Sequence, residues 1–452
     1  MSLHPREWLK SKLMKDTATL QVSSMLNQAS QLVSSVVLAF LLGAHGQGMY
    51  FLAITLQAVV YNLVNIGVVA ATTSQVAAAS VRDQREKVAG WLAFLVKANV
   101  IFSVGVIVIG WWALPFAARW YSPEIGPEEA ANLGRWAWYL AVWPLIDTPR
   151  AVAQVAFQGT RRMLYLGQLD NGQELIRAML VTFGALAWGG FEGALLGEIA
   201  SRLLSAYLGL DLYYAARNDG GAWLPSMREV FRKAPEIPFS VAMRLALRVG
   251  LVKNVNTLAM DLLPGLLLAK LTSPAYLAYY RVSTRVMGLP LLMLQGITRS
   301  ILPALSEKRG LRDLDGFRTI YYRATRWSGF LVGGFALALL PLVQPVVGAL
   351  FPRDYVGPVY VYCWILALGV IPVAFSVGLD AFYILTDQMR VCIKIALTGV
   401  AVTLPLNVYV IWAFPETGAA WGQTIYRSFV FVHFAFIAWY FRHSAGKGHW
   451  NR

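Results

Sequence analysis

Charged residues are scarce in this chain of 452 residues, of which only 14% are Asp, Glu, Lys or Arg. A soluble globular protein carries about a quarter charged residues, so the composition argues against a soluble fold. Cys363 and Cys392 are the only cysteines, which excludes a disulfide framework and a cysteine-based metal site. The sequence also lacks the Gly-x-x-x-x-Gly-Lys-Ser/Thr motif, which excludes ATP hydrolysis by a P-loop.

Long apolar runs are what the sequence has instead. Hydrophobic residues make up 57% of the chain, and the mean hydropathy is +0.53. Apolar runs of about 20 residues, enough to cross a hydrocarbon layer of about 30 Å, recur along the whole sequence. We therefore expect an all-α polytopic membrane protein with about twelve transmembrane helices. The expected spans are residues 18–43, 49–78, 89–115, 136–159, 170–190, 193–215, 241–271, 274–303, 325–350, 358–385, 390–413 and 418–441.

The loops between these spans alternate in charge. One set is rich in cations; the other is short, and its longest member contains Glu124, Glu128 and Glu129. Because cation-rich loops face the cytoplasm, both termini are expected to be cytoplasmic. The same rule explains most of the net charge of +15. The cations are dispersed over many short loops, so nucleic-acid binding is not expected. These loops contain Arg82, Arg85 and Lys87; Arg161 and Arg162; Arg217, Arg228, Arg232 and Lys233; Lys308, Arg309, Arg312 and Arg318; and Arg442 and Lys447.

The two halves of the chain look like a repeat. Residues 193–202 begin with Gly-Ala-x-x-Gly and end in Arg, and residues 418–427 have the same residue types at the same spacing. The same offset, within a few residues, places Asn27 opposite Asn256. It also places Tyr50 opposite Tyr279. An even number of helices per half indicates a parallel repeat about the membrane normal, which places a substrate path between the halves.

The repeat predicts the domain organisation. We expect an N-terminal six-helix lobe over residues 1–222 and a C-terminal six-helix lobe over residues 241–452. The segment 223–240 mixes Trp, Phe, Arg and Lys with Pro. We interpret it as a cytoplasmic interfacial linker, and a plain solvated loop is the alternative.

With these features the chain resembles the polysaccharide repeat-unit flippases, also called O-antigen flippases, of the multidrug/oligosaccharidyl-lipid/polysaccharide exporter superfamily. The order and spacing of three short motifs carry the resemblance. His45 and Gln47 depart from the pattern, because the family would have Pro and an acid in this turn. The motifs are the turn Leu42–Tyr50 ending in Gly-x-Tyr, the Arg161-Arg162 turn closing the fourth span, and Asn407 followed by the turn Pro415–Ala420.

The resemblance implies a transporter rather than an enzyme. It implies two six-helix lobes in a V, working by alternating access in the bacterial inner (cytoplasmic) membrane. A polyprenyl-diphosphate-linked (undecaprenyl-diphosphate type) oligosaccharide would move from the cytoplasmic to the periplasmic leaflet through a cationic central cavity. No catalytic residue, metal or cofactor is expected. The expected partners are the lipid-linked oligosaccharide, membrane lipids, a coupling ion (H⁺ or Na⁺) and glycan polymerase machinery, with the chain acting as a monomer.

Two other functions remain open from the sequence. A multidrug exporter of the same superfamily handles cations and favours acidic cavities, so the basic residues within the spans argue against it. A membrane-embedded polyprenyl-linked glycan polymerase or transferase normally presents catalytic acids or a sizeable surface loop. The loops opposite the cation-rich set are short, and Glu124, Glu128 and Glu129 are more typical of a solvated face.

Cations within apolar spans suggest where an anionic substrate binds. Each costs about 2.5–3.5 kcal/mol at the bilayer centre, so its presence indicates water, an acidic partner or an anionic ligand. Arg281 and Arg285 are one helical turn apart and share a face, which makes them the first candidates for binding a diphosphate. The alternative is ion pairing with Asp261 or another acid.

Further binding candidates come from other spans. Lys253 and Asn256 lie in the seventh span, where interhelical hydrogen bonding is the alternative. Arg244 and Arg248 are placed to recruit anionic headgroups at the cytoplasmic entrance, and simple snorkelling is the alternative. Arg150 in the fourth span is a candidate too, although an intrahelical salt bridge competes.

The remaining candidates concern the glycan, ion coupling and the repeat. Asn27, in a polar cluster of the first span, is placed either to contact glycan or to join helices. Asp147, Asp261 and Asp380 are candidates for ion coupling, but arginine neighbours would keep them ionised, which argues against simple protonation coupling. A structural role is favoured for Glu198, Arg202 and Arg427, because they recur beside glycine turns.

Overall fold

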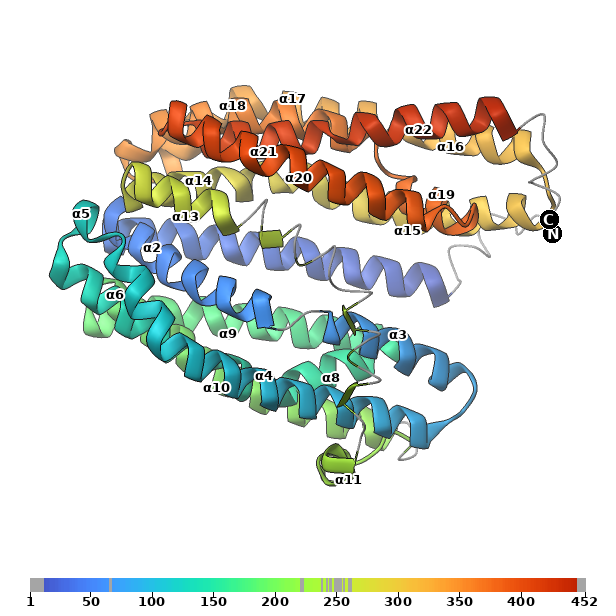
Figure 1. Cartoon of the computed structure of the whole chain (residues 1–452), viewed down its shortest axis with the longest axis horizontal. Coiled ribbons are helices and arrows are strands. Elements are labelled where there is room, and N and C mark those ends of the chain that lie inside the picture. Colours follow the sequence, from blue (N-terminus) through green and yellow to red (C-terminus); the bar gives the residue numbers. More distant parts are fainter. Residues whose placement is uncertain are drawn as a thin grey trace. The chain divides into compact units, whose positions relative to one another are not determined.

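The computed structural model describes residues 12–64, 67–219, 223–236, 239–240, 243, 246–247, 254, 257–258 and 262–444. Within these ranges the chain is helical with short turns and contains no strand (Figure 1). It divides into two compact units, Met1–Leu258 with Thr272–Ala278, and Ala259–Leu271 with Tyr279–Arg452. The lobe boundaries expected from the sequence stay a prediction.

The helices follow the expected spans in order. Unit 1 contains α2 (Lys12–Val64), α3 (Val68–Val81), α4 (Arg85–Arg119), α5 (Ser122–Ile125), α6 (Pro127–Leu140), α7 (Trp143–Ile146), α8 (Thr148–Gly159), α9 (Met163–Trp188), α10 (Gly190–Asp219), α11 (Met227–Lys233) and the turn η1 (Ala234–Glu236). Helices α14 (Pro274–Val286) and α15 (Gly288–Gly310) cover the eighth span; α14 begins in unit 1 and ends in unit 2. Unit 2 also holds α13 (Leu263–Leu271), α16 (Leu314–Ser328), η3 (Gly329–Gly333), α17 (Gly334–Leu350), α18 (Arg353–Ala374), α19 (Leu379–Leu385), α20 (Met389–Ala413), α21 (Gly418–Ser428) and α22 (Val430–Ser444).

Six helices of the described chain are long and apolar enough to cross a membrane. They are Gln21–Asn62, Arg85–Arg119, Leu314–Leu350, Arg353–Leu385, Met389–Ala413 and Gly418–His443. The expected span 49–78 is divided between α2 and α3. The other expected spans are shortened by proline breaks, carry ionisable residues, or, for residues 241–271, lie partly outside the described residues. The prediction of an all-α polytopic membrane fold is confirmed.

The turn after the first span is shorter than the sequence suggests. We expected it over Leu42–Tyr50, yet only Gly43 leaves the helical conformation, with φ 65° and ψ 178°. A residue with a Cβ is strained at that φ, so glycine is required here. The Gln47 side chain donates a hydrogen bond of 2.8 Å to the carbonyl of Ser35, which fixes the second segment against the first.

The fourth span is broken at two prolines. Pro144 and Pro149 each occupy the first turn of a short helix, α7 and α8. The Thr148 hydroxyl donates to the carbonyl of Pro144, which satisfies one of the acceptors that the break frees. Asp147 therefore lies at the break between the two short helices, inside unit 1.

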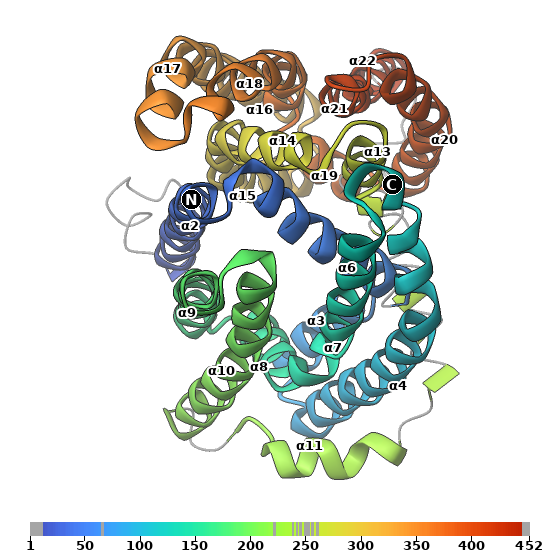
Figure 2. The same ribbon diagram turned by 90° about the vertical axis from the view of Figure 1, so that its left-hand side faces the viewer.

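The repeated glycines have the same packing role in each unit. A Cβ on Gly193 would lie 2.3 Å from the carbonyl oxygen of Gly184 on α9, and one on Gly418 would lie 2.4 Å from Cα of Ile411 on α20. Each sixth span therefore approaches the preceding helix at backbone contact distance, which only glycine permits. Figure 2 shows α9 and α10 lying side by side in this way.

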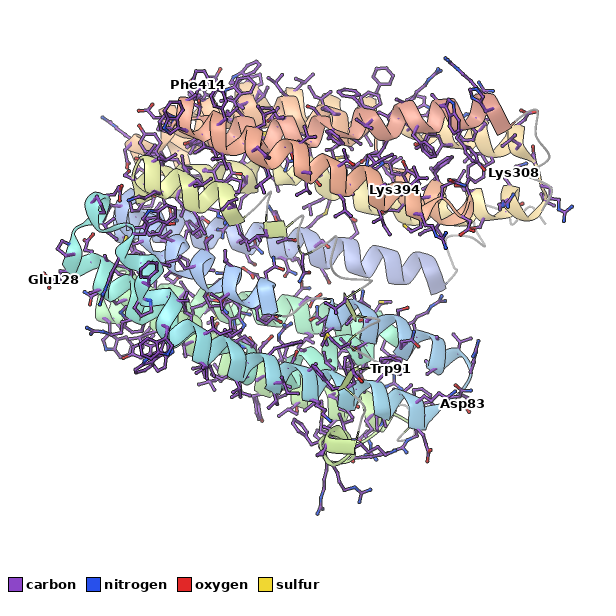
Figure 3. The ribbon with its side chains drawn as sticks, viewed as in Figure 1. Asp83, Trp91, Glu128, Lys308, Lys394 and Phe414 are labelled. Atoms are coloured by element: carbon purple, nitrogen blue, oxygen red, sulfur yellow. The ribbon has the colours of Figure 1, made fainter. Side chains whose placement is uncertain are left out.

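The loop charges segregate within each unit. In unit 1, Asp83, in the cation-rich loop, and Glu128, in the acidic loop, lie at opposite ends of the helices (Figure 3). In unit 2, Lys308 and Phe414 likewise lie at opposite ends. This is the alternation that the sequence predicts, and the assignment of the cation-rich end to the cytoplasm stays a prediction.

The expected linker is partly described and belongs to unit 1. Ser226 caps α11 by accepting a hydrogen bond from the Glu229 amide, and Arg85 forms an ion pair of 2.8 Å with Glu229. Lys97 donates to the carbonyl of Pro235, and the hydroxyl of Tyr213 donates to that of Pro225. The segment 223–235 is thus held to α4 and α10.

Candidate functional site

The most buried ionisable cluster in the described chain lies inside unit 1. Glu198 on α10 is 1% exposed, and Arg202, one turn later, is 6% exposed. Glu174 and Arg177 on α9 are buried as well, and Tyr50 on α2 completes the cluster. Three helices far apart in the sequence therefore bring their polar residues to one place.

Glu198 is the centre of this cluster. One of its carboxylate oxygens accepts a hydrogen bond of 2.7 Å from Arg202, and the other accepts one of 2.9 Å from the Tyr50 hydroxyl. Arg177 lies 3.7 Å from that second oxygen and donates to the oxygen of Tyr50. Arg177 is also paired with Glu174, three residues before it on the same helix.

The cluster is electrically neutral, with two carboxylates and two guanidinium groups. The Arg202 guanidinium stacks over the ring of Trp143 at 3.5 Å from its centroid, so its remaining face is covered by an aromatic surface. Breaking a buried pair leaves an uncompensated charge, which costs far more than the pair itself contributes. This geometry holds α2, α7, α9 and α10 in one register.

Arg150 and Asp147 form a second pair at the break in the fourth span. Two parallel bonds of 2.6 Å join the guanidinium to the carboxylate, and Arg150 also donates to Gln154 at 3.2 Å. Asp170 on α9 lies within electrostatic range of Arg150. The intrahelical salt bridge that competes with substrate binding is therefore formed. The roles of Arg150 in binding and of Asp147 in coupling stay predictions.

Arg281 and Arg285 both lie on α14, and both side chains are half-buried. Helical geometry puts them roughly 10 and 16 Å along the axis from Pro274, so both are well inside the expected span. The shared face that the sequence predicts is thus present. Their assignment to the diphosphate stays a prediction.

The other predicted site residues are scattered. Asn27 lies on α2 with a buried side-chain oxygen that has no hydrogen-bond donor among the described residues. Asp380 is exposed at the start of α19. Lys253, Asn256, Arg244, Arg248 and Asp261 lie outside the described residues.

Comparison with known proteins places the chain in a family. A family of polysaccharide biosynthesis proteins matches residues 13–308, which is more than half of the chain. The chain belongs to the polysaccharide biosynthesis protein family. The resemblance seen in the sequence is thereby confirmed at the level of the family. No curated protein matches the chain.

Solved structures similar to this family member are transporters and a flippase. An inward-facing multidrug resistance MATE family transporter of the MOP superfamily aligns with a TM-score of 0.70 at 15% identity, over 92% of this chain and 94% of the other. The lipid II flippase MurJ, in an inward closed conformation, aligns with a TM-score of 0.70 at 12% identity, over 92% and 86%. A MOP superfamily transporter from Pyrococcus furiosus aligns with a TM-score of 0.60 at 16% identity, over 99% and 100%. These likenesses establish the MOP superfamily fold.

Sequence reasoning missed how this family member's polar residues combine. The sequence offers Glu198 and Arg202 as a structural motif of the repeat. It carries no signal that Tyr50 joins the two pairs, or that Trp143 covers one of them. The i, i+3 and i, i+4 spacings mark pairs within a helix, whereas contacts between helices depend on packing.

Proposed function

We propose that this protein is a flippase that moves a polyprenyl-diphosphate-linked oligosaccharide from the cytoplasmic to the periplasmic leaflet. The observation that carries the proposal is the match to a polysaccharide biosynthesis family together with a MOP superfamily fold. A family that serves polysaccharide synthesis and has a transporter fold needs a substrate that is both a glycan and membrane-bound.

The residues of α14 support an anionic substrate. Arg281 and Arg285 put two permanent positive charges, half-buried, on one helical face. A diphosphate presents oxygens that match the planar guanidinium fork, and such bonds strengthen in a partly dehydrated cavity. In this proposal the two arginines bind the diphosphate, and Asn27, whose side-chain oxygen has no donor within the described part of the chain, contacts the glycan.

The test is binding of a short-chain polyprenyl-diphosphate sugar to the purified protein, by titration calorimetry. The variant Arg281→Ala/Arg285→Ala is expected to lose at least tenfold in affinity. Arg390→Ala/Lys394→Ala is the matched control, because it removes two exposed cations one turn apart at the start of α20. The control is expected to bind like the wild type.

Each other outcome changes the account in a defined way. Equal binding by the wild type and the Arg281/Arg285 variant contradicts the site, while equal weakening in both variants indicates an unspecific electrostatic effect. If none of the proteins binds the lipid and the wild type binds lipophilic cations, the flippase proposal fails in favour of a multidrug exporter. Glycan chains that lengthen on incubation with the protein alone would indicate a polymerase.

A further inference from the structure

Helix α16 of unit 2 has two faces of opposite character. One face is buried: Phe317 is 0% exposed and Tyr321 1% exposed, and their rings pack against Phe441. The Ser328 hydroxyl also donates a hydrogen bond of 2.8 Å to the carbonyl of Ala374, which joins the end of the helix to α18. The helix is therefore held firmly by its apolar face, and its other face is fixed in orientation.

That other face forms a groove of about 810 Å³. Its lining residues follow the periodicity of a helix face at positions i, i+3, i+4, i+7, i+8, i+11 and i+12. Three of them are arginines and one is an acid, so the groove has an excess of two positive charges. The lining consists of Asp315, Arg318, Thr319, Tyr322, Arg323, Arg326 and Trp327.

The arginines of the groove differ from those buried in unit 1. Arg150, Arg177 and Arg202 each pair with a carboxylate. Among the residues that the structure describes, neither Arg323 nor Arg326 forms an ion pair. The groove therefore offers guanidinium groups whose hydrogen-bond donors are available to an external anion.

The groove lies where the helix leaves the hydrocarbon layer. From Ser328 to Leu350 the continuous helix has no charged residue, and its length of about 34 Å matches a bilayer core. Arg326 and Arg323 then lie about 3 and 7 Å outside the core, within the headgroup layer. The neighbouring Trp327 is 70% exposed, which is typical of a residue at the interface.

An apolar surface continues directly from the groove. Phe330 is 72% exposed and Leu331 53% exposed, one turn beyond Trp327. Along the helix axis, the cations, the indole and the exposed hydrocarbon follow one another in the same order as the phosphate, the glycerol region and the acyl chains of a membrane lipid. The cation-rich stretch Lys308–Arg312, which ends α15 and precedes α16, assigns this end to the cytoplasmic leaflet by the positive-inside rule.

We propose that the α16 groove is a binding site for an anionic phospholipid of the cytoplasmic leaflet. Arg323 and Arg326 bind its phosphate, Trp327 lies at the level of the glycerol, and the acyl chains run along Phe330 and Leu331. Arg318, whose guanidinium lies 5.9 Å from the ring centroid of Tyr322, borders the outer end of the groove and binds the polar part of the headgroup. This site is independent of the proposed transport function.

The test measures binding of dioctanoyl phosphatidylglycerol to the purified full-length protein in a neutral detergent. Dioctanoyl phosphatidylcholine has the same chains and the same phosphate, but its quaternary ammonium group cancels the charge, so it reports binding without a net negative charge. The variant Arg323→Gln/Arg326→Gln is compared with Arg228→Gln/Arg232→Gln, which removes two exposed cations from α11. Both variants change the net charge equally. Neither alters a buried residue, so both are expected to fold, and thermal melting checks this.

The expected result is selective. The wild type binds phosphatidylglycerol at least tenfold more tightly than phosphatidylcholine. The α16 variant loses that preference, and the α11 variant keeps it within twofold. Arg323→Lys/Arg326→Lys is expected to recover only part of the affinity, because an ammonium group lacks the guanidinium fork.

Three results would overturn the proposal. Equal losses in the α16 and α11 variants would mean that the cations act only through overall charge. Equal binding of the two phospholipids by the wild type would remove the role of the lipid's net negative charge. Displacement of phosphatidylglycerol by a polyprenyl-diphosphate sugar at much lower concentration would assign the groove to that lipid instead.

Discussion

Tyr50 on α2 donates a hydrogen bond of 2.9 Å to Glu198 on α10, across 148 residues of sequence. The acceptor is 1% exposed, and two arginines balance its charge. This contact fixes the register between α2 and α10, because a shift of either helix along its axis would separate the hydroxyl from the carboxylate.

Removing the Tyr50 hydroxyl should weaken the fold without displacing the ring. Tyr50→Phe leaves a buried carboxylate oxygen with one donor fewer, which is expected to lower the free energy of unfolding by about 1–3 kcal/mol. The midpoint of thermal unfolding in detergent measures the effect. Tyr139→Phe, at an exposed position, is the control and is expected to melt like the wild type.

Neutralising Glu198 should be more severe. Glu198→Gln leaves Arg202 and Arg177 with an uncompensated positive charge in a buried site, at an expected loss of about 3–5 kcal/mol. The double variant Glu198→Gln/Arg202→Gln restores neutrality and should recover part of the loss. Glu128→Gln, on an exposed acid, serves as the reference. A double variant less stable than the single one would mean that the charges are not coupled.

The close helix contact at Gly193 is testable by adding one methyl group. Gly193→Ala would place a Cβ 2.3 Å from a backbone oxygen of α9, so the helices must separate and folded yield should fall sharply. Gly105→Ala, on α4, meets nothing within 4 Å and should be tolerated. Size-exclusion profiles of the two variants check this, and normal folding of Gly193→Ala would contradict the packing.

The start of α16 should respond to acid. Asp313 accepts hydrogen bonds from Lys308 and from the Gly316 amide, which hold the pKa of its carboxyl below the ordinary value of 3.8. A depressed pKa contributes stability above that ordinary value, and the contribution disappears as the pH falls through the lowered pKa. Exchange of the Gly316 amide, compared between the wild type and Asp313→Ala, should differ at neutral pH and converge at strongly acidic pH. A constant ratio at all pH values would contradict it.

The fold was largely predictable from the sequence. Apolar runs predicted the helices, because insertion into a bilayer depends on composition over about 20 residues. The turn at Gly43 was placed to within a few residues, since one glycine in the left-handed region is enough to end a helix.

The candidate site was less predictable. The pair of Arg281 and Arg285 on one helix face followed from spacing alone. The joining of Tyr50 to Glu198 did not, because it depends on how α2 and α10 pack. The α16 groove was missed as well: Arg323 and Arg326 lie in a stretch that resembles an ordinary cation-rich helix end. Their significance comes from the lack of ion-pair partners among the described residues, which only a structure reveals.

The most direct test of transport is translocation in proteoliposomes. A fluorescent short-chain polyprenyl-diphosphate oligosaccharide, loaded into one leaflet, is followed by a membrane-impermeant quencher in the other. The flippase proposal predicts transfer that needs the protein and is lost in Arg281→Ala/Arg285→Ala, with Arg390→Ala/Lys394→Ala remaining active. Transfer no faster than in protein-free liposomes, by a wild-type protein shown to be folded and inserted, would contradict it.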